Sequence, residues 1–127
     1  VIISSLDETL IKNTAKKLAR VDNLIYIASS NFFHYGPKYE FTPFRYNLKN
    51  EIGYLRDSLL ESAISIDPDK FLSLVNKVGI TFGVAPIVLL LEILKIKNAK
   101  RGKLLSNELV KEEESNIVGI ASIVYNK

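Results

Sequence analysis

The feature that most constrains the fold is an uninterrupted apolar run at residues 24–28, with the sequence LIYIA. Its β-branched and aromatic residues are typical of a strand that is buried on both faces. Upstream, Ser5 and Glu8 have the spacing of a capping box for a helix that extends to about Arg20. A further short apolar run occupies residues 1–4. Strand, helix and strand in this order predict a parallel βαβ unit with a right-handed crossover.

Three further helices are predicted by apolar residues at helical spacing. Asp67 and Pro68 give a clear start signal, because an N-cap carboxylate is followed by proline in the first turn. The last helix is nearly all apolar and follows a glycine-containing break at residues 79–83, so we expect it to be buried. The expected helices cover residues 48–65, 67–78 and 85–98.

Two late strands are predicted at residues 102–110 and 116–125, on either side of an acidic loop at residues 111–115. Strands this close in sequence pair most easily as an antiparallel hairpin. The predicted fold class is therefore α/β, with a parallel βαβ start, four helices and a terminal antiparallel hairpin, in one domain over residues 1–127. This is a thin sheet for four helices, so we expect another segment or chain to supply more strands.

Composition and charge exclude several classes of function. The longest uncharged run, residues 78–91, is shorter than the roughly 20 residues that cross a bilayer, so no membrane partner is expected. The net charge is only +3, and the basic residues between 95 and 103 are not interleaved with stacking aromatics, so no nucleic-acid partner is expected. The chain has no cysteine, which excludes disulfides, thiolate metal ligands and a cysteine nucleophile.

The start of the chain carries two further indications. It contains no basic segment followed by an apolar run and a cleavage site, so the expected location is the cytoplasm. Position 1 is Val1, and an apparent strand follows at once. We therefore expect the sequence to begin inside a longer reading frame.

Polar residues gather directly after the second expected strand. Residues 29–36 contain two hydroxyls, an amide and the only histidine of the chain. In open α/β sheets, ligands bind beyond the carboxyl ends of the strands. The break at Thr81, Phe82 and Gly83 is expected to bring backbone amides near the same place. The candidate ligand-binding pocket consists of Ser29, Ser30, Asn31, His34, Tyr35 and Phe82.

His34 is the candidate catalytic and metal-binding residue, because an imidazole titrates near neutral pH and ligates metals. The alternative is a histidine that is hydrogen-bonded to the structure at a strand end. Ser29 and Ser30 could act as nucleophiles beside it, but no nucleophile-elbow motif is present. Hydroxyls that cap loose backbone groups are the favoured interpretation of these two serines.

Aromatic residues crowd the loop from residue 29 to residue 46. They predict either a binding surface for a peptide, a partner or an aromatic ligand, or a loop folded back over the sheet, and the second is favoured. Asp57 and Glu61 lie one helical turn apart and could pair as acid and base, but an exposed helix face is favoured. Residues 112–114 are all glutamate and are interpreted as a solvated turn rather than a cation site.

The strand-end segment also carries a resemblance. Residues 29–31 (SSN) and 34–36 (HYG) resemble the Ser-Ser-Asp-x-x-His-Tyr-Gly motif of the Memo family, whose fold is similar to that of LigB-type class III extradiol dioxygenases. The resemblance covers nearly all of this chain and about the C-terminal half of a family member, which implies half of a three-layer LigB-like domain. Further blocks agree in order and spacing at residues 64–71, 80–83, 86–87 and 118–122.

The resemblance also implies what the metal pocket contains. The family's metal is expected to be held by two histidines from the N-terminal half and by a cysteine that aligns with Phe82, and an aspartate aligns with Asn31. Phe82 has no lone pair to donate, and Asn31 supplies no negative charge. We therefore expect a vestigial metal site with no cofactor from this chain alone, and iron or copper only if a second half supplies ligands.

Two functions from different classes follow. The leading hypothesis is a non-catalytic binding or scaffold protein in a homo- or hetero-oligomer, completed by an N-terminal half of the same reading frame or by a partner polypeptide. Contact would use the aromatic loop or an uncovered sheet edge. The alternative is an iron- or copper-dependent redox enzyme of dioxygenase-like fold, in which the missing half supplies the histidines and His34 is an acid–base residue over the substrate.

Overall fold

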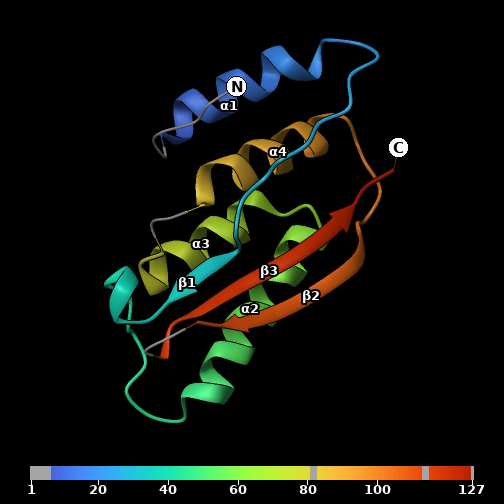
Figure 1. The fold of residues 1–127 in the computed structure, drawn as a ribbon. Coiled ribbons are helices and arrows are strands. Elements are labelled where there is room, and N and C mark those ends of the chain that lie inside the picture. Colours follow the sequence, from blue (N-terminus) through green and yellow to red (C-terminus); the bar gives the residue numbers. More distant parts are fainter. Residues whose placement is uncertain (1–6, 81–82, 113–114, 127) are drawn as a thin grey trace.

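The structure, a computed structural model, describes residues 7–80, 83–112 and 115–126 (Figure 1). These residues form a mixed α/β fold with four α-helices and a small antiparallel sheet, which confirms the predicted class and the number of helices. In chain order the elements are α1 (Glu8–Ala19), β1 (Phe33–Tyr35), the 3-10 helix η1 (Pro37–Tyr39), α2 (Leu48–Ile64), α3 (Pro68–Val78), α4 (Val84–Ile96), β2 (Lys103–Lys111) and β3 (Ile117–Val124).

The sheet has the order β1-β3-β2, and both pairings are antiparallel. The β2–β3 hairpin runs from Lys103 opposite Val124 to Lys111 opposite Ile117, which confirms the predicted hairpin within one residue at each end of each strand. The short strand β1 pairs only with the first residues of β3. Beyond that pairing, one edge of β3 continues without a neighbouring strand in the described chain.

The helix starts follow local capping chemistry. Asp67 is the N-cap of α3, and its carboxylate accepts a hydrogen bond from the backbone N–H of Lys70 at 2.9 Å, as predicted. Helix α1 begins at Glu8 with Asp7 as its N-cap. The predicted cap, Ser5, lies outside the described residues. An aspartate at position 7 satisfies the same orphan N–H groups that a serine would, which explains the later start.

The second expected strand is not formed. Residues 24–28 are extended, but their backbone groups make no hydrogen bond with any described residue, and the described sheet contains no parallel pair. The prediction of a parallel βαβ unit is therefore wrong, because residues 24–28 do not form its second strand. Its predicted first strand, residues 1–4, lies outside the described residues. A strand forms only beside another strand edge, and this part of the chain first meets β3 where Phe32 N–H donates to Gly119 C=O at 2.9 Å.

The core lies between the helices and one face of the sheet (Figure 1). Helix α4 is apolar on almost every side and is largely buried, as predicted, and Ile11 and Ala15 of α1 pack into the same cluster. Phe33 of β1 is paired with Gly119 of β3. A Cβ atom on residue 119 would lie 2.6 Å from the Phe33 ring, so the glycine makes room for this aromatic side chain. Each fully buried Phe, Leu or Ile contributes about 1.5–3 kcal/mol to folding.

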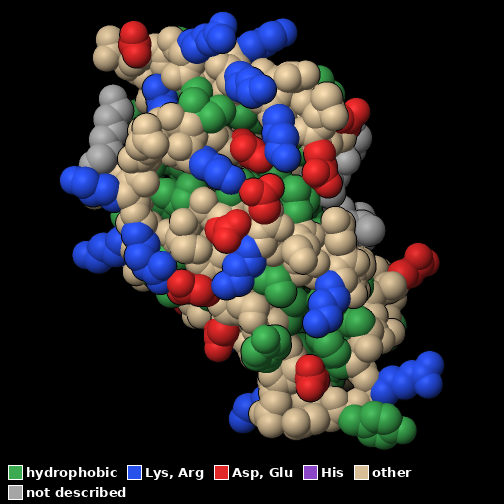
Figure 2. Space-filling model, turned by 180° about the vertical axis from the view of Figure 1, so that it is seen from behind, with side chains coloured by type: hydrophobic (Ala, Val, Ile, Leu, Met, Phe, Trp, Pro, Cys, Tyr) green, Lys and Arg blue, Asp and Glu red, His purple; other side chains and the backbone are tan. Residues whose placement is uncertain are grey.

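The two faces of the molecule differ. Seen from behind, Figure 2 shows lysine, arginine and acidic side chains interspersed over the surface, as on an ordinary solvated face. On the other face of the sheet, Ile120 and Val124 of β3 and Val110 of β2 are exposed. No helix in the described ranges is long and apolar enough to span a membrane.

Candidate functional site

A hydrogen bond from Ser30 joins the segment after residue 28 to the start of α4. Its hydroxyl donates to the carbonyl of Gly83 at 2.9 Å and also contacts the carbonyl of Asn31 at 3.2 Å. Gly83 has a φ of +75°, and a Cβ atom there would lie 2.5 Å from both Ser30 Oγ and Asn31 O. The expected approach of the α4 break to the strand-end segment is therefore present at Gly83, while Thr81 and Phe82 lie outside the described residues.

Asn31 and His34 form the polar centre of the candidate site. Asn31 Nδ2 lies 3.0 Å from His34 Nε2, so the amide donates to the ring nitrogen when that nitrogen carries no proton. The half-buried imidazole also packs against Tyr39, with ring centroids 4.5 Å apart and planes tilted by 40°. These contacts hold the imidazole against the loop that follows β1.

Glu112 adds a carboxylate next to this centre. Its Oε2 accepts from the hydroxyl of Tyr39 at 2.6 Å and from Lys38 Nζ at 3.1 Å. The Tyr39 hydrogen bond, followed by that of Lys38, lowers the pKa of Glu112. The hydrogen bond to Glu112 is also the first cause of the raised pKa values of Tyr39 and Lys38. We call Asn31, His34, Lys38, Tyr39 and Glu112 the His34 cluster.

Sequence reasoning assigned Glu112 to a solvated turn and missed its place in this cluster. The contact forms because β1 and β2 pair on opposite edges of β3, which brings the end of β2 toward the loop after β1. A backbone bond strengthens the junction, since Lys38 N–H donates to Asn116 Oδ1 at 3.1 Å. No local sequence pattern predicts the ion pair between Lys38 and Glu112, because these residues are far apart in the chain.

The remaining predicted site residues have other positions. Ser29 is exposed, whereas Tyr35 is buried, and its ring packs parallel to that of Phe44 at 6.3 Å. The Tyr35 hydroxyl donates to the carbonyl of Phe44 at 3.4 Å. Phe32 and Phe33 are buried as well, so the aromatic loop is folded back and closes the core along most of its length.

Asp57 and Glu61 do not form a carboxylate pair. Asp57 accepts from Arg56 at 2.8 Å, while both oxygens of Glu61 accept from Arg101 at 2.7 and 2.9 Å. Arg101 lowers the pKa of Glu61, chiefly through this hydrogen bond. The two carboxylates therefore serve separate ion pairs on an exposed helix face, as favoured from the sequence.

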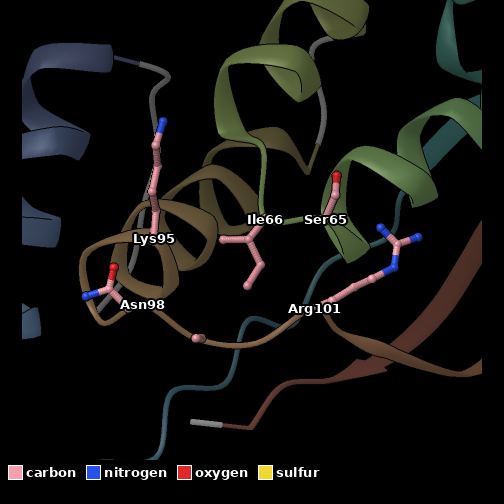
Figure 3. A pocket seen from close by; sticks show the side chains of 6 residues that line it. Ser65, Ile66, Lys95, Asn98 and Arg101 are labelled. Atoms are coloured by element: carbon pink, nitrogen blue, oxygen red, sulfur yellow. The ribbon is translucent and has the colours of Figure 1, made fainter.

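A hollow of about 420 Å³ lies where the C-terminal ends of α2 and α4 meet (Figure 3). Lys95 and Arg101 reach it from two sides, but Lys95 Nζ donates to Asp69 at 3.0 Å and Arg101 is bound to Glu61. Both positive charges are thus neutralised, and the carbonyl ends of the helices disfavour an anion. The hollow is lined by Ser65, Ile66, Lys95, Asn98, Ala99 and Arg101.

Two larger hollows flank residues 24–28. One, of about 510 Å³, lies between this segment and residues 121–126 and has Leu90 and Leu94 of α4 in its lining; we call it the strand groove. The other, of about 500 Å³, lies toward α1 and the opposite side of α4. Ile25 and Ile27 are 90% and 86% exposed. Sequence reasoning placed both residues in a buried strand and did not predict their exposure.

The described residues do not by themselves form a site for iron or copper. The Nε2 atom of His34 lies 3.0 Å from the side-chain amide of Asn31. Within the described ranges, His, Asp and Glu side chains nowhere gather in a group of three or more that would hold a metal ion. A protein metal site commonly needs about three ligands, so a metal at His34 would require donors from elsewhere.

The fold and the His34 cluster define a mixed α/β domain with a polar centre at the start of a small antiparallel sheet. The sequence model of the Memo family, described as Memo-like protein, matches residues 1–124. The chain therefore belongs to the Memo family, as the motif in residues 29–36 implied. No curated protein matches the chain closely enough to count as a relative.

Proposed function

We propose that this chain is a non-catalytic binding or scaffold member of the Memo family, completed by an N-terminal half or by a partner polypeptide. The single observation that carries the proposal is the exposure of Ile25 and Ile27, at 90% and 86%, on a segment with the composition of a buried strand. Exposure of large apolar side chains to water is unfavourable in free energy. A bound polypeptide would cover them and remove this unfavourable term.

Other exposed apolar residues support the same proposal. Soluble monomers rarely expose extended apolar patches, and such patches mark interaction sites. Large apolar side chains are exposed both in the segment at residues 24–28 and in the two hairpin strands. They are Leu24, Ile25, Ile27, Leu104, Leu105, Val110, Ile120 and Val124.

The His34 cluster supports a structural role for the histidine in this chain. Its imidazole contacts Asn31 on one side and Tyr39 on the other, and the cluster joins the loop after β1 to the end of β2. In a family whose metal pocket is expected to contain a carboxylate and a thiolate, this chain has an uncharged amide at Asn31 and no ligating atom at Phe82. We infer that the pocket is vestigial.

Mixing experiments test the proposal directly. The probe is the N-terminal half of a complete Memo-family protein, expressed separately and added to this chain. Sedimentation velocity should show a 1:1 complex at micromolar concentrations. Independent sedimentation of the two chains at 100 µM each, a concentration chosen well above typical interface affinities, would overturn the proposal.

Metal analysis of the same complex separates the binding protein from the redox enzyme. We expect no stoichiometric iron or copper after incubation of the complex with either metal. Metal bound at one equivalent, and lost in the His34→Ala variant, would support the alternative of an iron- or copper-dependent redox enzyme. Metal that stays bound in His34→Ala would place the ligands in the other half. The hypothesis that the pocket of this chain is vestigial would then still hold.

A further inference from the structure

We propose that the strand groove receives one β-strand of the partner polypeptide, which hydrogen-bonds to both walls. This inference rests on the proposed function and specifies how the partner binds. The walls are two extended backbones, residues 24–28 on one side and residues 121–126 on the other. An inserted strand would join residues 24–28 to β3 in one continuous sheet.

The wall formed by β3 has free backbone groups with a definite spacing. Gly119 C=O accepts from Phe32 N–H, so the polar groups of Gly119 point away from β2. Because backbone direction alternates along a strand, the N–H and C=O groups of Ala121 and Ile123 point the same way. Those of Ser122 point toward Ser106 on β2. Ala121 and Ile123 therefore offer two donors and two acceptors to the groove.

The opposite wall is a longer run of free groups. The backbone N–H and C=O groups of residues 24–28 make no hydrogen bond within the described ranges. Tyr26 is tied down through its side chain only, since its hydroxyl donates to the carbonyl of Leu18 at 2.8 Å. Unpaired extended backbone is a template for strand addition, which supplies both a donor and an acceptor to every second residue.

The floor and the charge of the groove specify the side chains of the inserted strand. Leu90 and Leu94 of α4 contribute apolar surface to its lining. Lys97 is the one charged residue in the lining, and its Nζ already donates to the carbonyl of Ala19 at 3.0 Å and lies 5.8 Å from the centre of the Tyr26 ring. The other lining residues are uncharged, so the strand that fits the groove carries apolar or small uncharged residues.

Residue-resolved amide exchange tests the insertion, with the N-terminal half of a complete Memo-family protein as the probe. In the complex, the amides of Ala121 and Ile123 should exchange at least tenfold more slowly than in the free chain, as should alternate amides within residues 24–28. The amide of Ser122 is the internal control, because it already faces β2 and should change little.

The outcomes separate this inference from the proposed function. A complex that forms while Ala121 and Ile123 exchange as fast as before would overturn the insertion and leave the proposed function standing. Absence of a complex would overturn both. Slower exchange at Ala121 and Ile123 in a self-associated sample of this chain alone would identify a second copy as the occupant and would overturn the assignment to the partner.

A pair of variants at one position gives a second test. Ala121→Pro removes an N–H that faces the groove and leaves the β2 ladder intact, so the hairpin amides should stay slow. The affinity for the N-terminal half should fall at least tenfold. Ala121→Val keeps the N–H and should keep the affinity within about threefold. Equal affinities of the two variants, both shown to be folded by their hairpin amides, would contradict the insertion.

Discussion

The hydroxyl of Tyr39 donates a 2.6 Å hydrogen bond to Oε2 of Glu112, and this bond joins the loop after β1 to the end of β2. Lys38 donates to the same oxygen at 3.1 Å, and His34 packs against the Tyr39 ring. His34 of the motif in residues 29–36 therefore packs against a hydrogen-bonded junction that the motif does not contain. We therefore expect the stability of this region to depend on pH.

Glu112 is expected to stabilise the fold at neutral pH and to lose that effect in acid. Its pKa is lowered in the folded chain, first by the Tyr39 hydrogen bond and then by that of Lys38. A lowered pKa gives stability that is present above the ordinary value of 4.5 and is lost as the pH falls through the folded value. Urea unfolding at pH 7 and pH 3 should show that Glu112→Gln lowers the midpoint more at pH 7.

Glu108→Gln is the matched control for this prediction, since Glu108 is an exposed glutamate within β2, the strand that ends one residue before Glu112. It should change the midpoint little at either pH. Should Glu112→Gln shift the unfolding midpoint equally at pH 7 and pH 3, the charge of Glu112 does not stabilise the junction.

Gly83 is expected to be essential to the join between α4 and the strand-end segment. In Gly83→Ala, the added Cβ would lie 2.5 Å from the carbonyl oxygen of Asn31, and the φ of +75° would disfavour any L side chain. We expect a loss of about 1–3 kcal/mol in the free energy of unfolding, measured by urea denaturation.

Gly53 supplies the matched control, because it lies inside α2 and a Cβ there meets nothing within 4 Å. Gly53→Ala should therefore stabilise the chain by about 0.5–1 kcal/mol. Gly79→Ala has open space but a φ of +83°, so it isolates the cost of the backbone conformation alone. A Gly83→Ala variant no less stable than Gly79→Ala would show that the contact with Asn31 is not tight.

Tyr125 is expected to limit stability at alkaline pH. Burial raises the pKa of Tyr125 to about 12, and its hydroxyl donates to the carbonyl of Ala63 at 2.9 Å. A raised pKa gives stability that is full below the ordinary value of 10.0 and is lost as the pH rises toward 12. Unfolding measured between pH 8 and pH 11.5 should show this loss in the native chain.

In Tyr125→Phe, part of the alkaline loss should disappear, while the stability at pH 8 falls by about 0.5–1.5 kcal/mol because one hydrogen bond is missing. Tyr39→Phe is a useful comparison, since the pKa of Tyr39 is raised mainly by its bond to Glu112 rather than by burial. Identical pH profiles for Tyr125→Phe and the native chain would exclude Tyr125 as the source of the alkaline loss.

Local signals predicted most of the fold. The Asp67–Pro68 start, the spacing of apolar residues in α2 and the uninterrupted apolar surface of α4 each act within one helix, so they can be recognised from the sequence. The hairpin was predictable for the same reason, because its strands are neighbours in the chain. Residues 24–28 have the composition of a buried strand, but composition cannot show whether a neighbouring edge is present.

The candidate site was only partly predictable. The contact between Asn31 and His34 spans three residues, and the motif in residues 29–36 already pointed to both. Tyr39, Lys38 and Glu112 join them only through the pairing of β1 with β3, which no periodicity in the sequence marks. Tyr35 carries a polar group but belongs to the core, because its ring packs with Phe41 and Phe44.

We propose that the exposed apolar segment at residues 24–28 binds another polypeptide. This binding is tested most directly by calorimetric titration of this chain with the N-terminal half of a complete Memo-family protein. Each buried isoleucine contributes about 1.5–3 kcal/mol, so the Ile25→Asp, Ile27→Asp double variant should weaken binding by about 100-fold or more. Tyr54→Asp, at an exposed aromatic residue of α2, should bind as the native chain does. Equal affinities for the double variant and the native chain would contradict the claim.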